Sequence, residues 1–217
     1  FNNEIWSPLA TKLTWSHYCE LLSIKDINEI SYYINISEEQ NLSKRQLREK
    51  IKSKEYQRLD DNTKLKLINK EETVVSDFIK NPIVIRNKYN IDKKSVTEKI
   101  LQRLILEDIP SFLKELGEGF TFVENEYKIK IGNTYNYIDI LLFNIKFNCY
   151  VVIELKVTEL KKEHIGQIQI YMNYVDKNIK TINQDKTIGV IICKKDNGYY
   201  IEYSSDNRIF SKNYILS

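Results

Sequence analysis

The stretch VVIELK, residues 151–156, continues a long apolar run and ends with two opposite charges. In a β-strand, side chains two positions apart share a face, so Glu154 and Lys156 would point to the same side while the alternate positions stay apolar. A charged pair on such a strand is costly unless it is solvated, ion-paired or bound to an ion. The stretch therefore predicts a strand that carries a polar site.

A second apolar segment, IDILL at residues 138–142, contains a single acid, Asp139. Turn-forming residues divide this region into three strand-like segments, at 120–131, 135–143 and 147–157. A three-strand meander would bring Asp139 opposite the far end of the third strand, where Glu154 lies. Two carboxylates offer the hard oxygen ligands that Mg²⁺ or Mn²⁺ prefers, and Lys156 beside them could offset charge on a phosphate.

The remaining elements predict an α/β fold preceded by an all-helical domain. Residues 1–80 have apolar positions at helical spacing, and Ser43 with Gln46 forms a capping box that begins a helix. The hydrophilic stretch 81–95, which begins at Asn81-Pro82, predicts a linker. We expect residues 96–217 to form a mixed sheet flanked by helices.

Within residues 96–217, a long amphipathic helix at 96–116, interrupted or bent at Pro110, is predicted before the meander. A second helix at 163–176 follows the meander, with Gly166 expected to allow close packing on the sheet. An apolar strand is predicted at 187–193 and an edge strand at 199–203.

Composition and charge limit the classes of function. The chain has 217 residues and a net charge of +3, too small by itself to indicate a nucleic-acid-binding protein. Residues 44–70, however, hold ten Lys or Arg against four Asp or Glu. The three cysteines are far apart and the two histidines lack partners at ligand spacing, so neither a zinc site nor a Ser-His-Asp hydrolase is expected. With no apolar run of about 18 residues and no signal sequence, we expect a cytoplasmic protein outside the membrane.

Several segments resemble a known family. Ile138-Asp139, with fourteen residues between Asp139 and Glu154-Leu155-Lys156, resembles the PD-(D/E)XK nuclease signature. Residues 116–144, 164–176 and 187–194 are similar to the nuclease domain of the bacterial YhcG-like family of PD-(D/E)XK proteins, and residues 13–26 and 42–59 are similar to that family's N-terminal helical domain. The resemblance covers nearly the whole chain.

The resemblance implies a restriction-endonuclease-like fold and metal-dependent hydrolysis of DNA. Asp139, Glu154 and the carbonyl of Leu155 would be metal ligands, and Lys156 the catalytic lysine. Gln167 and Tyr171, four residues apart on one helical face, resemble a QxxxY element that borders the active site in related nucleases. The family often adds a glutamate from the helix before the sheet: Glu98, Glu107 and Glu115 are available, and we expect Glu107.

The family usually has a Gly-Arg-Gln type of sequence where this chain has Glu124-Asn125-Glu126. Any role of that arginine is therefore not expected here.

Each interpretation has a simpler alternative. Glu154 and Lys156 could be an ordinary ion pair at a strand end, and Gln167 and Tyr171 ordinary surface and core residues. The basic helix could be a solvated face or could bind phosphates; we expect nucleic-acid contacts from Lys44, Arg45, Arg48 and Lys52. The helical domain could instead mediate self-association, with a homo-oligomer as the result.

The rival function is a non-catalytic DNA-binding or scaffold protein that retains the nuclease fold. RNA is not excluded as a substrate, because both nucleic acids present the same phosphodiester.

Overall fold

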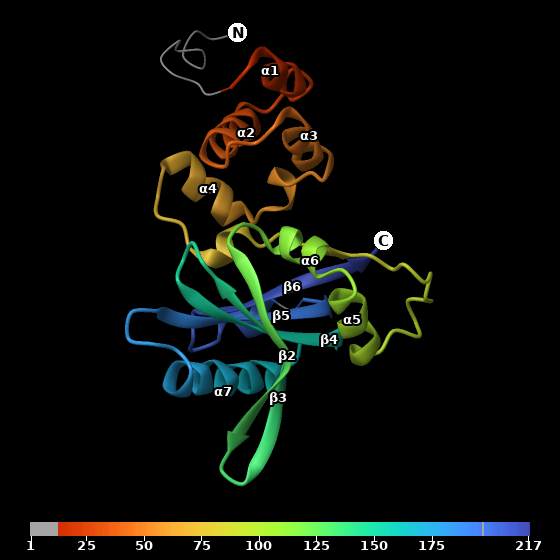
Figure 1. Ribbon diagram of the computed structural model, residues 1–217, viewed down its shortest axis with the longest axis vertical. Coiled ribbons are helices and arrows are strands. Elements are labelled where there is room, and N and C mark those ends of the chain that lie inside the picture. The colour runs from red at the N-terminus through yellow and green to blue at the C-terminus, as the bar shows by residue number, and fades with distance from the viewer. Residues whose placement is uncertain (1–12, 197) are drawn as a thin grey trace. The chain divides into compact units, whose positions relative to one another are not determined.

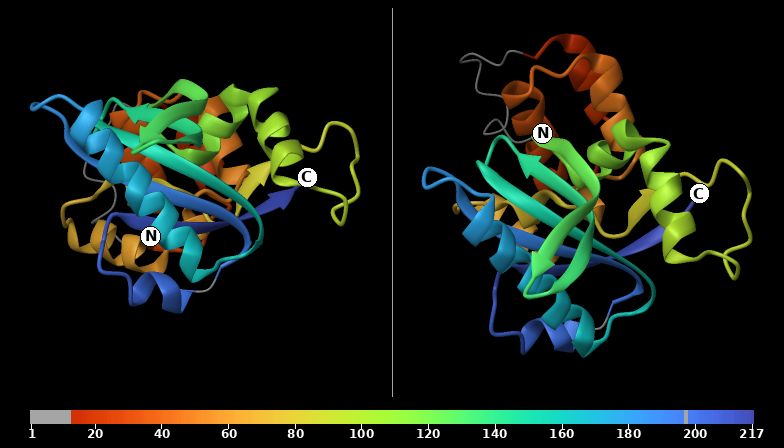
Figure 2. Two further views of the ribbon diagram at one scale, coloured as in Figure 1. Left: turned by 90° about the horizontal axis from the view of Figure 1, so that it is seen from below. Right: turned by 60° about the horizontal axis from the view of Figure 1, so that its bottom comes forward.

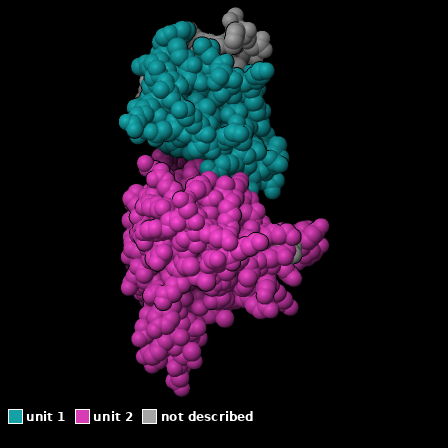
Figure 3. All heavy atoms as spheres, turned by 90° about the vertical axis from the view of Figure 1, so that its right-hand side faces the viewer, with its two compact units in different colours: residues 1–73 teal, residues 74–217 magenta. Residues whose placement is uncertain are grey.

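The computed structural model describes residues 13–196 and 198–217. The chain divides into two compact units, residues 1–73 and residues 74–217, which Figure 3 shows in separate colours. The division confirms a helical region followed by an α/β region, but it falls at residue 73 and not at residue 80. Among the described residues, no helix combines the length and the apolar character needed to cross a membrane.

Unit 1 is helical. Its elements are α1 (Trp15–Leu21), α2 (Ile27–Glu39), α3 (Lys44–Lys52), the short 3-10 helix η1 (Tyr56–Arg58) and α4 (Asp61–Asn69). The predicted capping box begins α3, since the Ser43 N–H donates to Gln46 Oε1 at 2.8 Å and the Gln46 N–H donates to Ser43 Oγ at 3.4 Å. Tyr33 and Leu47, both fully buried, lie at the centre of the apolar core.

Unit 2 is built on a six-stranded sheet in the order β1-β6-β5-β4-β3-β2 (Figure 1). Strands β2, β3 and β4 form the predicted antiparallel meander, whereas β4, β5, β6 and β1 pair in parallel, so the sheet is mixed. The elements are η2 (Val75–Phe78), β1 (Ile83–Ile85), α5 (Glu98–Leu106), α6 (Ile109–Leu116), β2 (Phe120–Ile131), β3 (Thr134–Asn144), β4 (Cys149–Glu159), α7 (Lys162–Asn178), β5 (Asp185–Lys195), α8 (Gly198–Glu202) and β6 (Ile209–Leu216).

Two apolar clusters hold this sheet between its helices. Helices α5 and α6 pack with Ile140 and Ile153 in one cluster, and α7 packs with Leu141 and Val152 in the other. These pairs alternate along β3 and β4, as the two faces of a buried sheet require. The two further views in Figure 2 show α7 lying along the sheet. Burial on both faces explains why the paired parts of β3 and β4 are almost entirely apolar.

The prediction of a linker at residues 81–95 is wrong in part. Residues 83–85 form β1, which pairs in parallel with β6 through Ile83 and Tyr214. Ile83 and Ile85 are buried in the same core cluster as α5 and α6. Apolar burial therefore draws this short segment into the sheet in spite of the preceding proline.

The prediction of an edge strand at residues 199–203 is also wrong, because this segment contains the short helix α8. Tyr199 and Tyr203 are 73% and 82% exposed, so the segment has no buried face that would stabilise a strand. The position beside β5 is occupied by β6 instead.

Helix α7 packs closely on the sheet at Gly189 on β5, and not at Gly166 as the sequence suggested. A Cβ at Gly189 would lie 2.5 Å from Met172 Sδ and 2.9 Å from Ile168 Cδ1, whereas a Cβ at Gly166 would have no such neighbour within 4 Å. We expect Gly189→Ala to lower the free energy of unfolding by about 1–3 kcal/mol through overpacking.

Gly166→Ala is the matched control, and it should raise the free energy of unfolding by up to about 1 kcal/mol because alanine favours helix. Chemical denaturation followed by circular dichroism measures both changes. Equal stability of Gly189→Ala and the unsubstituted protein would contradict the close approach.

Candidate active site at the fork between β3 and β4

Strands β3 and β4 stop pairing just before two acids. Their register runs from Asn144 paired with Cys149 to Ile140 paired with Ile153. The next positions in this register are Asp139 and Glu154, which therefore lie opposite each other where the strands diverge. The meander thus brings the two predicted acids together, at a fork where backbone groups no longer pair.

The Asp139 side chain replaces a main-chain hydrogen-bond partner that β4 lacks beyond the fork. Its Oδ2 accepts a hydrogen bond of 2.7 Å from the main-chain N–H of Leu155, a group that a continuing β3 would otherwise satisfy. Burial raises the pKa of Asp139 above its usual value, the Leu155 N–H lowers it, and the charges of Glu98 and Glu126 add to the rise. The carboxylate is therefore held in place in surroundings that favour a positive partner.

Glu154 and Lys156 form a buried ion pair. The two side chains are 2% and 9% exposed as whole residues, and Lys156 Nζ donates to Glu154 Oε1 at 2.8 Å. Burial first, and the charge of Asp139 second, raise the pKa of Glu154 to about 7. Burial alone would lower the pKa of Lys156, but its hydrogen bond and charge interaction with Glu154 outweigh burial and raise it. An ordinary solvated pair at a strand end does not describe this arrangement.

Helix α5 contributes a third acid, Glu98. Its Oε2 lies 3.8 Å from Lys156 Nζ, and the side chain is about half exposed. Glu107 is at the other end of α5, roughly 13 Å along the helix axis at 1.5 Å per residue, and pairs with Arg103 at 3.6 Å. The expectation that Glu107 joins the site is therefore wrong, because the N-terminal end of α5 faces the fork.

Gln102 was not predicted to take part. Its Nε2 donates to the main-chain oxygen of Asp139 at 3.0 Å, so it holds the backbone of the fork. Gln102 is one turn after Glu98, on the same side of α5, and is only 9% exposed. A polar residue on the buried side of an amphipathic helix was the signal that could have identified it.

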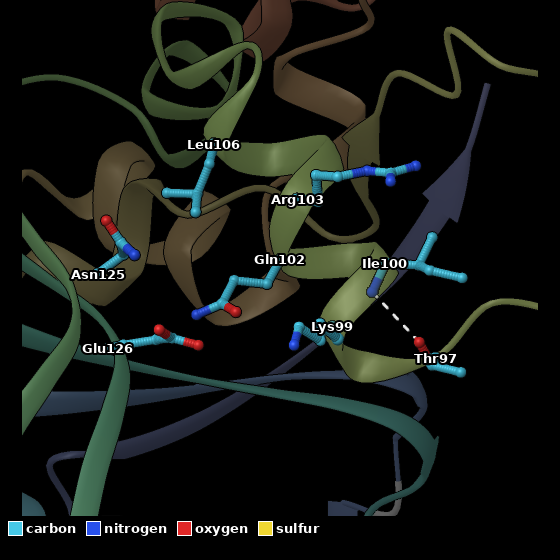
Figure 4. A pocket seen from close by; sticks show the side chains of 8 residues that line it. All are labelled: Thr97, Lys99, Ile100, Gln102, Arg103, Leu106, Asn125 and Glu126. Atoms are coloured by element: carbon cyan, nitrogen blue, oxygen red, sulfur yellow. Dashed lines mark hydrogen bonds between the residues drawn. The ribbon is translucent and has the colours of Figure 1, made fainter.

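A pocket of about 410 Å³ lies beside the fork, between α5 and β2 (Figure 4). In Figure 4 the side chains of Gln102, Asn125 and Glu126 point toward the same space. The residues that line it are Thr97, Lys99, Ile100, Gln102, Arg103, Leu106, Asn125 and Glu126. The lining offers amide groups, cations and one carboxylate, and Glu126 is close enough to influence the pKa of Asp139.

Gln167 and Tyr171 on α7 are hydrogen-bonded to each other, and Tyr171 lies within electrostatic reach of the fork. Gln167 Nε2 donates to the Tyr171 hydroxyl oxygen at 3.0 Å. Burial raises the pKa of Tyr171, the hydrogen bond with Gln167 lowers it, and the charges of Glu154 and Asp139 raise it. Because its oxygen accepts from Gln167, the Tyr171 hydroxyl can donate its own hydrogen elsewhere.

The basic residues of α3 are largely paired within unit 1. Arg48 donates two hydrogen bonds to Glu20, at 2.7 and 2.9 Å, and Lys44 lies 3.6 Å from the same carboxylate. Arg45 pairs with Glu49 at 3.2 Å, while Lys52 is exposed. These acids offset much of the positive charge that the sequence assigned to α3.

The fork has the donor set for a divalent cation. Glu154 Oε2 is buried and accepts no hydrogen bond within the described part of the chain. The negative charge of Asp139 is near enough to raise the pKa of Glu154. Among the described residues, no three Asp, Glu, His or Cys side chains cluster as a metal-binding group. A cation here would therefore take two carboxylates and complete its shell with main-chain oxygen and water, a pattern typical of Mg²⁺.

Comparison with known proteins gives matches along most of the chain. The model of a family described as the YhcG PDDEXK nuclease domain matches residues 76–216, and that of the DUF1016 N-terminal domain matches residues 1–58. A protein of Escherichia coli strain K12, described as "Putative nuclease YhcG", is 26% identical over 199 residues, covering 88% of this chain and 52% of that protein. The chain thus spans about half the length of this curated relative.

Solved structures give weaker matches. A repair endonuclease from Pyrococcus abyssi has 16% identity and a TM-score of 0.40, over 55% of this chain and 47% of that one. A complex described as EndoMS-dsDNA2 has 18% identity and a TM-score of 0.41, over 58% and 48% of the two chains.

Proposed function

Because the chain belongs to the YhcG PDDEXK nuclease domain family, we propose that it hydrolyses DNA phosphodiester bonds with a divalent cation at the fork between β3 and β4. The observation that carries this proposal is the buried pair of Glu154 and Lys156 beside the half-buried Asp139, in which Glu154 Oε2 lacks a hydrogen-bond donor among the described residues. The ion pair and the Leu155 N–H satisfy part of this group, and a bound cation would satisfy the remaining carboxylate oxygen of Glu154.

Each residue of the fork has a distinct task in this proposal. Asp139, Glu154 and the carbonyl oxygen of Leu155 would hold Mg²⁺ or Mn²⁺, which when bound stabilises negative charge on the phosphate oxygens. Lys156, kept protonated by Glu154, would orient the attacking water and offset charge that develops on the phosphate. Tyr171, oriented by Gln167, would donate a hydrogen bond at the border of the same site.

The proposal is tested by incubating the protein with linear, circular and single-stranded DNA in Mg²⁺, Mn²⁺ or EDTA. Cleavage with either cation and none in EDTA is the expected result, and cleavage of circles would identify an endonuclease. Absence of cleavage on all three substrates, with the protein folded and both cations supplied, would contradict the proposal.

The second proposal is a DNA-binding or scaffold role for the basic helix α3 without catalysis. The exposed side chains Arg45 and Lys52 favour it, because both can still reach phosphates. DNA affinity falls as salt rises, and the slope of log affinity against log salt concentration reports the number of phosphate contacts. We expect Arg45→Ala/Lys52→Ala to make this slope less steep by about 1–2.

Fluorescence anisotropy at several salt concentrations measures this slope. Arg48→Ala is the comparison variant, since Arg48 is already bound to Glu20 and should change the slope less. An unchanged slope in Arg45→Ala/Lys52→Ala would show that these two residues of α3 do not contact DNA.

A further inference from the structure

Strands β2 and β3 continue past the fork as a two-stranded arm. Pairing of β3 with β4 is confined to residues 140–144 of β3, whereas β2 and β3 remain paired as far as Ile131 and Thr134. Figure 1 shows this hairpin projecting beyond the rest of the sheet. We define the arm as residues 127–138. Its last residue, Ile138, directly precedes Asp139 in β3.

One side of the arm is anchored in the core of unit 2. Ile129 is 1% exposed and Ile138 is completely buried, and both belong to the apolar cluster that includes α7 residues. Tyr127 packs partly against the same cluster. Because residues alternate along a strand, this anchoring fixes the opposite side of the arm toward solvent.

The outer side carries two lysine–tyrosine pairs. Lys128 is paired across the strands with Tyr137, and Lys130 with Tyr135. The tyrosines are 50% and 53% exposed, and both lysines are exposed. Lys128 Nζ lies 4.0 Å from the centre of the Tyr135 ring, a cation–π contact that holds the charge and the ring together.

The outer side leads directly to the proposed catalytic acids. Tyr137 is two positions before Asp139 in β3, so the outer side of the arm ends next to the fork. In the register of β2 with β3, Glu126 is the position opposite Asp139. A chain lying along Lys130, Lys128 and the two tyrosines would therefore arrive at the fork.

We infer that the outer side of the arm binds single-stranded DNA adjacent to the bond that is cut. Lysines attract the phosphates, and exposed tyrosine rings stack on bases without regard to sequence. In a duplex the faces of the bases are already stacked on one another, so the tyrosines would have no partner there. This inference rests on the proposed function and names the form of its substrate.

The test compares binding of one labelled oligonucleotide of about 20 nucleotides, as a single strand and as a duplex, in EDTA so that nothing is cut. Tyr135→Ala/Tyr137→Ala should weaken binding of the single strand about tenfold or more and leave duplex binding unchanged. Tyr135→Phe/Tyr137→Phe, which keeps both rings, should bind the single strand as the unsubstituted protein does.

Tyr199→Ala/Tyr203→Ala is the matched control, since these two tyrosines are also exposed and lie outside the arm. Single-strand affinity that survives loss of the arm tyrosines, or falls equally for duplex and single strand, would overturn the inference. Cleavage in Mg²⁺ is scored separately. Arm-dependent binding without cleavage would contradict the proposed function alone, whereas cleavage with arm-independent binding would contradict the inference alone.

Discussion

Replacement of Lys156 by methionine is expected to lower the rate of DNA cleavage by about a thousandfold or more. The methionine keeps an unbranched apolar stem but removes the ammonium that contacts Glu154 at 2.8 Å. Without it, the fork loses the buried cation that lies beside Glu154. The measurement is the initial rate of plasmid cleavage in Mg²⁺, and a rate like that of the unsubstituted protein would exclude Lys156 from catalysis.

The same substitution separates a catalytic role from a structural one. Lys156→Met removes the two interactions that lower the pKa of Glu154, so Glu154 should take up a proton near neutral pH, and the free energy of unfolding should fall by less than the about 3–5 kcal/mol that an unpaired buried charge costs. Glu154→Gln/Lys156→Met removes both charges and should recover most of that loss while remaining inactive. Recovery of cleavage together with stability would show that Lys156 only supports the fold.

Addition of Mg²⁺ is expected to raise the melting temperature of the protein. At a concentration a hundred times its Kd, a cation bound only to the folded state stabilises it by about 2.7 kcal/mol. For a chain of this size that corresponds to an increase of about 5–10 °C. Thermal denaturation with and without Mg²⁺ measures the shift, and Asp139→Asn, which removes one ligand charge, should abolish most of it.

The pH dependence of this shift follows from Glu154. Its pKa is raised from 4.5 to about 7, by burial first and by Asp139 second, so in metal-free protein its contribution to stability is present below pH 4.5 and is lost as the pH rises through about 7. The cation requires the deprotonated carboxylate, so the Mg²⁺-induced shift should be larger above pH 7 than below it. An equal shift on both sides of pH 7, or an unchanged shift in Asp139→Asn, would contradict binding at the fork.

The sequence alone was sufficient for the meander and its two acids. Short turns and the apolar pattern of residues 120–157 determine the register, and that register places Asp139 opposite Glu154. The helix at 163–176 was likewise confirmed, with α7 extending slightly beyond both predicted ends. These features depend on local periodicity and on contacts between neighbouring segments.

Features that depend on distant contacts were not predicted. Strand β1 has three residues, and its partner β6 lies at the other end of unit 2. Glu98 and Glu107 are both acids of one helix, and only the packing of α5 determines which end faces the fork. The pairing of Arg48 with Glu20 joins residues 28 positions apart, so the count of charges along α3 overestimated its free positive charge.

We propose that the acids at the fork are the catalytic centre of a DNA-cleaving enzyme. The most direct measurement compares plasmid cleavage in Mg²⁺ by the unsubstituted protein and by Asp139→Asn, purified in parallel and shown to be folded. Asparagine preserves the size of the side chain and an oxygen for the Leu155 N–H, while removing the charge. We predict cleavage by the first protein and a loss of about a thousandfold in the second; comparable cleavage by both would contradict the assignment of this site.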